Sequence, residues 1–321
     1  MKNKVIVVFF LLSITVISAE KLNVVTTIFP IYDFAKIIGG EFANVELVLT
    51  PGIDAHSFEP TPKNIIKISN SDIFFYTNMY MEPWAEKIKQ NRSLKKAYIV
   101  DTSENITMYN TNEKLKKENC HHKHMEINCD EPNHKHEVNG NNHHTHSLDP
   151  HIWLDPILAI EIVKNIRDAY IKVDEKNKEY YIENCNKYLN ELTKLDNLIK
   201  NIINNSNNKI IVYAGHFAFG YFALRYGLEY ISPYEGFSPN AEPTPKKISN
   251  LINSLKEYNL NYIFYENMEN TKIIETIAKE TNSEILPLYT IDNITREDFN
   301  TVSSYLYYMK LNIDSLKKGL N

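Results

Sequence analysis

The chain has 321 residues, a formal net charge of −5 and only 9 glycines. This length exceeds what one hydrophobic core normally holds, so we expect more than one domain. The slightly acidic balance excludes the basic surface typical of nucleic-acid binding, and no glycine-rich loop followed by Lys-Ser or Lys-Thr indicates a nucleotide site.

The first 18 residues have the pattern of a secretory signal. Lys2 and Lys4 precede an apolar run from Val5 to Ile17, which is too short to cross a hydrocarbon core that needs about 20 residues. We therefore expect residues 1–18 to be cleaved, with an uncleaved membrane tether as the alternative. The first cysteine is Cys120, so we expect no lipid anchor and a soluble protein of the periplasm.

Short runs of β-branched and aromatic residues predict strands in both halves of the chain. Helical patterns between the first three strands favour a largely parallel sheet. We expect an α/β fold of two related lobes, each a mostly parallel sheet flanked by helices. The predicted strands are Asn23–Thr27, Val45–Thr50, Ile73–Thr77, Ala97–Val100, Ile210–Tyr213, Leu228–Ile231, Tyr262–Tyr265 and Ile285–Tyr289.

An internal repeat supports two related halves. The run Glu-Pro-Thr-Pro-Lys occurs at 59–63 and again at 242–246. In each copy the threonine (Thr61 or Thr244) can cap a helix, with proline at the first helical position. The Thr-Pro part is therefore explained by structure alone, and the glutamates need another explanation.

A long helix is predicted over Lys176–Asn204, where apolar residues recur at alternating spacings of four and three without proline or glycine. At 1.5 Å per residue it would run about 40 Å and join the lobes rigidly. Cys185 falls on its apolar stripe and is predicted to be a buried structural thiol. A coiled-coil dimer is the alternative to the monomer we expect. The predicted domains are 19–156 (N-terminal lobe), 157–205 (helical connector) and 206–321 (C-terminal lobe).

The region 102–148 shows no sustained period and is rich in Asn, Lys, His and Glu. We predict a loop that is disordered without metal and that gathers metal ions. Two cysteines in it fit either a disulfide or thiolate ligands of a second zinc. The accessory residues are His121, His122, His124, His134, His136, His143, His144, His146, Cys120 and Cys129.

The remaining three histidines stand alone. His56 and His216 each follow a predicted strand, one in each lobe, and His151 lies at a boundary between loop and helix. Open α/β sheets bind ligands at the carboxyl ends of their strands. A lone histidine can equally satisfy a loop backbone, but all three lie beside the ends of elements. We therefore predict one metal site between the lobes.

Four segments, in order, resemble the zinc-specific solute-binding proteins of bacterial ABC importers, the ZnuA-like group of the cluster A-I metal-binding family. They are Gly52–Pro60, Asp149–Pro156, Gly215–Phe222 and Tyr226-Gly227, with the histidine-rich loop between the first two. The resemblance implies that His56, His151 and His216 bind the metal. It also implies a fourth ligand after the last strand, where Asp292 matches, or a water; Glu59 is a further alternative. Manganese-carrying relatives have Glu where His216 stands.

Ligand chemistry favours the same metal. Three imidazoles suit tetrahedral Zn²⁺, whereas manganese prefers carboxylate oxygen; nickel, copper and cobalt also accept imidazole. Glu59 and Glu242 are expected to accept hydrogen bonds from the ligand imidazoles, with loop carboxylates satisfied by their own surroundings as the alternative. Trp84 and Trp153 are predicted to pack, and Asp155 to cap the following helix.

The sequence therefore predicts a protein that captures Zn²⁺ in the periplasm and delivers it to the permease of an ABC importer with its ATPase. No organic substrate and no enzymatic activity are expected. A secreted zinc hydrolase with Glu59 as base is the alternative from another class, but the chain has no His-Glu-x-x-His run. Further alternatives are a manganese- or nickel-binding homologue and a zinc buffer or adhesin. Affinity is expected to fall as pH drops through about 6.5.

Overall fold

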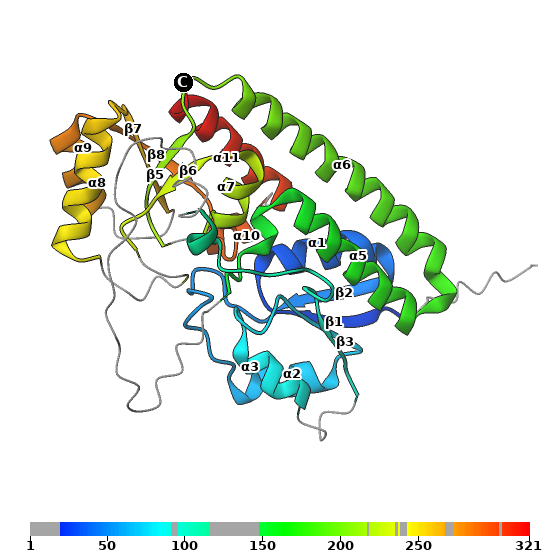
Figure 1. Ribbon diagram of the computed structural model, residues 1–321. Coiled ribbons are helices and arrows are strands. Elements are labelled where there is room, and N and C mark those ends of the chain that lie inside the picture. Colours follow the sequence, from blue (N-terminus) through cyan, green and yellow to red (C-terminus); the bar gives the residue numbers. More distant parts are fainter. Residues whose placement is uncertain are drawn as a thin grey trace, which may run out of the picture.

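The computed structural model describes residues 20–90, 96–115, 148–216, 218–234, 237, 243–266, 272–301 and 304–321. They form two four-stranded sheets, ordered β2-β1-β3-β4 and β6-β5-β7-β8, in which the strand pairs are parallel (Figure 1). The same order in both sheets confirms an α/β fold of two related lobes. The strands are β1 Leu22–Thr26, β2 Ala43–Leu47, β3 Ile73–Tyr76, β4 Tyr98–Asp101, β5 Ile210–Ala214, β6 Glu229–Ile231, β7 Tyr262–Glu266 and β8 Glu284–Leu288.

Helices cover both faces of each sheet. On the outer faces, α2 and α3 pack on the first sheet, and α8 and α9 on the second, each pair with a small apolar cluster of its own. On the inner faces lie α1, α5, α7 and α11. The helices are α1 Phe29–Gly39, α2 Pro62–Asn70, α3 Pro83–Gln90, α5 Pro156–Val173, α6 Lys178–Asn204, α7 Gly220–Tyr226, α8 Pro245–Glu257, α9 Lys272–Thr281, α10 Arg296–Phe299 and α11 Tyr305–Gly319.

The largest apolar cluster extends through both lobes. Phe75 of β3 and Phe264 of β7 belong to it, together with the buried sides of the inner helices. At its centre the ring of Phe34 in α1 contacts that of Tyr305 in α11, with centroids 4.9 Å apart. Because the interior is close-packed, the two lobes are held as one body.

The helix α6 runs along the outside of the molecule past both lobes (Figure 1). Its buried residues, Tyr181, Cys185, Tyr188, Leu192, Leu195, Asp196, Ile199 and Ile203, lie on one stripe. The predicted long helix is confirmed, except that Glu175–Asn177 form a 3-10 turn before it. Cys185 is fully buried with a free thiol. Among the helices of the described residues, none is long and apolar enough to span a membrane.

Two of the three predicted helix caps are present. Thr61 accepts from the backbone N–H of Asn64, whose side chain accepts from Thr61 in return. Asp155 accepts from the backbone N–H groups of Ile157 and Leu158 and so caps α5. Thr244 is also an extended residue before a proline, but its side chain makes no capping bond, so that prediction is wrong.

Most predicted strands shift by one residue at one or both ends, and two further predicted boundaries change by more than that. β2 ends at Leu47 and not at Thr50, although the N–H of Val48 still donates to Thr26 O at 2.8 Å. The predicted loop 102–148 is structured at its start, because Thr102, Thr111 and Leu115 are buried. Residues 116–147, with the accessory histidines and cysteines, lie outside the described residues, as does the predicted signal.

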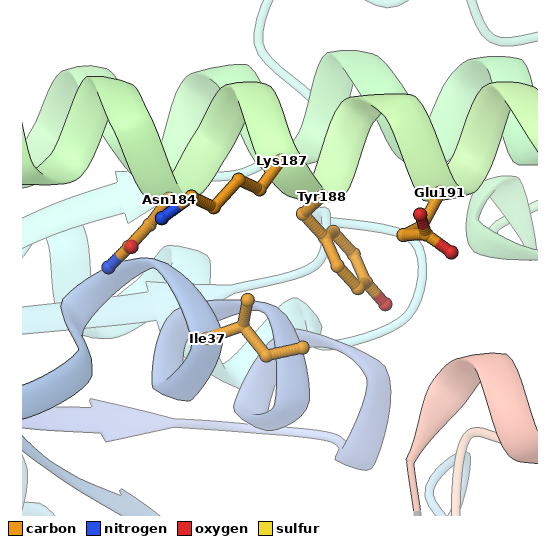
Figure 2. A pocket seen from close by; sticks show the side chains of 5 residues that line it. All are labelled: Ile37, Asn184, Lys187, Tyr188 and Glu191. Atoms are coloured by element: carbon orange, nitrogen blue, oxygen red, sulfur yellow. The ribbon is translucent and has the colours of Figure 1, made fainter.

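A pocket of about 230 Å³ lies between α1 and α6 (Figure 2). Tyr188 points from α6 toward α1 across it, and Asn184, Lys187 and Glu191 lie along the same helix above Ile37. None of the three lone histidines lines this pocket. It is therefore a packing gap beside the long helix and separate from the site described next.

Candidate metal centre

The three lone histidines meet at one point between the lobes. Nε2 of His151 lies 3.2 Å from Nε2 of His56 and 3.2 Å from Nε2 of His216. Their candidate ligand atoms all lie within 4.8 Å of one another. A tetrahedral ion with Zn–N bonds of about 2.0–2.1 Å places its ligand atoms about 3.3–3.4 Å apart. The spacing of the nitrogens therefore fits a single tetrahedral ion.

Each histidine comes from the end of an element. His56 lies in the loop after β2, His216 is the second residue after β5, and His151 is the N-cap of the 3-10 turn Ile152–Leu154. His151 and His216 are 0% and 1% exposed, whereas His56 is only partly buried. The placement at strand ends is what open parallel sheets favour for binding. His56 is the ligand candidate with the most access to solvent.

A carboxylate and a hydroxyl stand behind His151. Nδ1 of His151 lies 2.8 Å from Oδ1 of Asp149, which also accepts from the His151 backbone N–H at 3.0 Å. The Thr111 hydroxyl donates to the other oxygen of Asp149. A carboxylate at Nδ1 favours the tautomer with its proton there, and leaves the Nε2 lone pair facing the site.

His216 is held in the same way from the second lobe. Its Nδ1 lies 2.6 Å from Oε2 of Glu266, at the end of β7. The Thr290 hydroxyl donates to the other oxygen of Glu266 at 3.3 Å. Both buried imidazoles therefore turn Nε2 toward the shared centre.

The carboxylates behind the imidazoles are not the two glutamates predicted from the sequence. Glu59 is exposed and makes no hydrogen bond or ion pair within the part of the chain that the structure describes, so its predicted role behind an imidazole is wrong. Glu242 lies outside the described residues. The sequence reasoning missed Asp149 and Glu266. The Asp-Pro-His spacing, and the position of Glu266 at the carboxyl end of a strand, were the available signals.

Asp292 interacts electrostatically with His216 but lies outside the cluster of three histidines. It is 7% exposed, in the turn after β8. Burial raises the pKa of its carboxyl to about 6, with repulsion from Glu266 as the next cause, while attraction to His216 lowers it. An acidic group buried beside these side chains is a candidate for cation binding.

The turn around Asp292 has an unusual backbone. Ile291, which is buried, has φ 67°. A β-branched residue rarely adopts this left-handed conformation, and such strain costs on the order of 1–3 kcal/mol. The surrounding contacts must therefore impose the conformation of this turn.

Both tryptophans pack, as predicted. Trp84 contacts Phe58 and Phe74 in the outer cluster of the first lobe. Trp153 is fully buried, and its ring centroid lies 5.3 Å from that of His151. Its indole N–H donates to Thr290 O at 2.7 Å. Trp153 thus links the ring of one histidine to the turn that carries Asp292.

The surroundings favour the neutral form of His56 and His151. Burial first, and then the charge of His216, lowers the pKa of His56 to about 3. Burial likewise holds the pKa of His151 well below its usual range. A neutral imidazole is the form that binds metal. At these two imidazoles protons therefore compete with the ion only well below a pH of about 6.5.

We expect zinc affinity to fall by much less than about 1,000-fold between pH 7.5 and pH 5.5, because His56 and His151 stay neutral over this range. Three imidazoles of ordinary pKa near 6.5 would each lose about 10-fold over this interval, or up to about 1,000-fold together. Competition titrations against a chelator of known pH dependence measure the difference. A loss approaching 1,000-fold would mean that the folded site does not depress these pKa values.

A two-lobed α/β protein with a metal-ligating cluster between its lobes has the architecture of a solute-binding protein. The family model ZnuA, described as zinc-uptake complex component A, periplasmic, matches residues 24–319. The chain belongs to this family.

Two relatives with known names support this family assignment. The high-affinity zinc uptake system protein ZnuA of Bacillus subtilis is 33% identical over 301 residues, which cover 94% of this chain and 88% of that protein. The zinc-binding protein AdcA of Streptococcus pyogenes serotype M3 is 32% identical; the match covers 99% of this chain but 61% of AdcA. The chain spans about three-fifths of the length of AdcA.

Solved structures show the same fold. The metal-dependent lipoprotein YcdH from Bacillus subtilis superposes with a TM-score of 0.75 at 32% identity, covering 94% of this chain and 99% of that one. Zn(II)-bound AdcA from Streptococcus pneumoniae superposes with a TM-score of 0.74 at 29% identity, covering 94% and 58%. Both likenesses extend over the two lobes.

Proposed function

We propose that this protein captures Zn²⁺ outside the cytoplasm and delivers it to the membrane permease of an ABC importer, which works with its own ATPase. The observation that carries the proposal is the cluster of His56, His151 and His216, whose ligand atoms lie within 4.8 Å of one another. Two of these imidazoles are fixed by buried carboxylates, which is how proteins orient zinc ligands. Family membership supports the transport role.

Asp292 is our proposed fourth ligand, with a water as the alternative. Its carboxyl is buried near His216 and would be ionised by an adjacent dication, despite the raised pKa. Three neutral nitrogens and one carboxylate suit zinc better than manganese, which favours more oxygen ligands. The expected metal order therefore places zinc above manganese.

The geometry supports a binding role more than hydrolysis. A catalytic zinc keeps an open position beside a general base. Within the described residues, Glu59, the base considered from sequence, is exposed, and both Asp149 and Glu266 already accept from imidazoles. The named relatives are zinc uptake and zinc-binding proteins. A periplasmic location and a monomeric state complete the proposal.

Calorimetric titration of metal-free protein with Zn²⁺, Mn²⁺ and Ni²⁺ tests this function. We expect one tight zinc site, and weaker or no binding of manganese. Cells lacking the protein should regain zinc uptake when it is restored together with its permease. Manganese binding tighter than zinc, or uptake that does not depend on the protein, would contradict the proposal.

The histidine-rich loop is proposed to gather ions without forming the tight site. Deleting 120–146 should lower the number of zinc ions bound and leave the tightest one, because none of the clustered histidines lies in that range. The same calorimetric titration counts both classes of site. Loss of the tight site in the deletion variant would show that the loop contributes to it.

A further inference from the structure

The turn after β8 is attached to both buried ligands. Its Thr290 hydroxyl bonds the carboxylate behind His216, and its Thr290 carbonyl accepts from Trp153, whose ring contacts His151. The carbonyl of Asp292 accepts from the backbone N–H of Phe29 at 3.1 Å, at the start of α1. These bonds fix the turn to the core, so the next side chain along it projects from a rigid base.

That side chain is Asn293, and it reaches the loop that carries His56. Its Oδ1 accepts from the backbone N–H of Gly52 at 3.3 Å, and its Nδ2 donates to the carbonyl of Ile53. One amide thus engages two consecutive residues of the other lobe. Ile53 is 43% exposed, so water can replace these bonds without any unfolding of the core.

A tight turn connects these contacts to His56. The carboxylate of Asp54 accepts from the backbone N–H groups of His56 and Ser57, at 3.0 and 3.2 Å. The far end of the loop is anchored separately, because Phe58 packs on Trp84 with centroids 5.9 Å apart. His56 therefore lies between an anchor in its own lobe and a polar contact to the other lobe.

We propose that Asn293 is a positioning residue that holds the His56 loop closed over the metal and sets the rate at which zinc leaves. The proposal rests on the function proposed above. The other two imidazoles are fully buried and backed by carboxylates, so the partly exposed His56 is the ligand that can withdraw first. Without Asn293 the loop keeps its Phe58 anchor and its Asp54 turn but loses its hold on the second lobe.

Zinc dissociation into excess chelator, followed by stopped flow, tests the role of Asn293. We expect Asn293→Ala to release zinc about 10-fold faster, because it loses both hydrogen bonds to the His56 loop, together with the one that its Oδ1 accepts from the backbone N–H of Ile294 in its own turn. Thermal unfolding of the metal-free protein should stay close to that of the native chain. Asn300→Ala is the matched control, because the Asn300 side chain donates to the carbonyl of Arg296, in the helix that Asn300 caps, at 2.9 Å. This variant should release zinc at the native rate.

A double-variant cycle separates positioning from a general structural effect. If Asn293 acts through His56, then Asn293→Ala should change the release rate less than 2-fold in a His56→Ala background. The serine side chain of Asn293→Ser is too short to bond both backbone groups, so this variant should release zinc at the same rate as Asn293→Ala. Agreement between the two variants would exclude a folding defect particular to one of them. Native release rates in both variants, or a full 10-fold effect without His56, would overturn the proposal. A native protein that binds no zinc would instead refute the proposed function.

Discussion

Replacing His216 with alanine should remove most of the stabilisation that zinc gives the protein. At zinc equal to 100 times the native dissociation constant, binding adds about 2.7 kcal/mol to the free energy of unfolding. We expect the variant to bind zinc at least about 100-fold more weakly. Mutation of a residue that only hydrogen-bonds to a metal ligand already lowers metal affinity by about 10–100-fold, and His216 is a proposed ligand itself. The gain would then fall to about 0.4 kcal/mol, and the zinc-dependent rise in Tm would shrink by roughly 5 °C.

Tyr181→Phe is a suitable control for this experiment. Tyr181 lies on the long helix, and its hydroxyl donates at 2.7 Å to Asp174, which caps α5; neither residue belongs to the histidine cluster. The control should lower the Tm of the metal-free protein and keep the whole zinc-dependent rise. If scanning calorimetry shows the same rise for His216→Ala as for the native chain, His216 is not a ligand.

Asp149→Asn should weaken zinc binding by about 10–100-fold, although Asp149 does not face the proposed ion. The carboxylate accepts from Nδ1 of His151 and from the Thr111 hydroxyl. An amide of the same shape can present its NH₂ group to Nδ1, which favours the tautomer whose Nε2 carries a proton and cannot bind metal. Competition with a chromophoric zinc chelator measures the change.

Glu59→Gln is the matched carboxylate control for Asp149→Asn. Glu59 is exposed, and it lies in the same loop as His56, so we expect less than a 2-fold change in affinity. This control also tests the alternative in which Glu59 completes the coordination. Equal losses in the two variants would contradict the geometry described for this site.

The three clustered histidines could be predicted because their signal is local. His56 and His216 follow predicted strands, whose ends parallel sheets gather at one edge, and His151 lies just before a predicted helix. The long helix was predictable for a similar reason: its stripe repeats over many turns with no helix-breaking residue. Both predictions depend only on the order of residues within a short stretch of sequence.

The carboxylates behind the histidines required the tertiary structure. Glu266 is 50 residues from His216 in sequence, and the two meet because β5 and β7 pair in parallel, with Ala214 opposite Tyr265. Glu59 was selected from a repeated motif, but the repeat reflects a Thr-Pro helix start. Such a motif does not specify which way the neighbouring carboxylate points. Sequence patterns therefore miss hydrogen-bond partners that come together only through the pairing of distant strands.

The apolar cluster that passes through both lobes has a consequence for how the molecule loses its structure. Since Phe34 of α1 packs on Tyr305 of α11, neither sheet can expose its inner face while the other stays intact. Unfolding should then be one cooperative transition, despite the two-lobed shape. An ion bound between the lobes would slow amide hydrogen exchange in the central strands of both sheets by a similar factor.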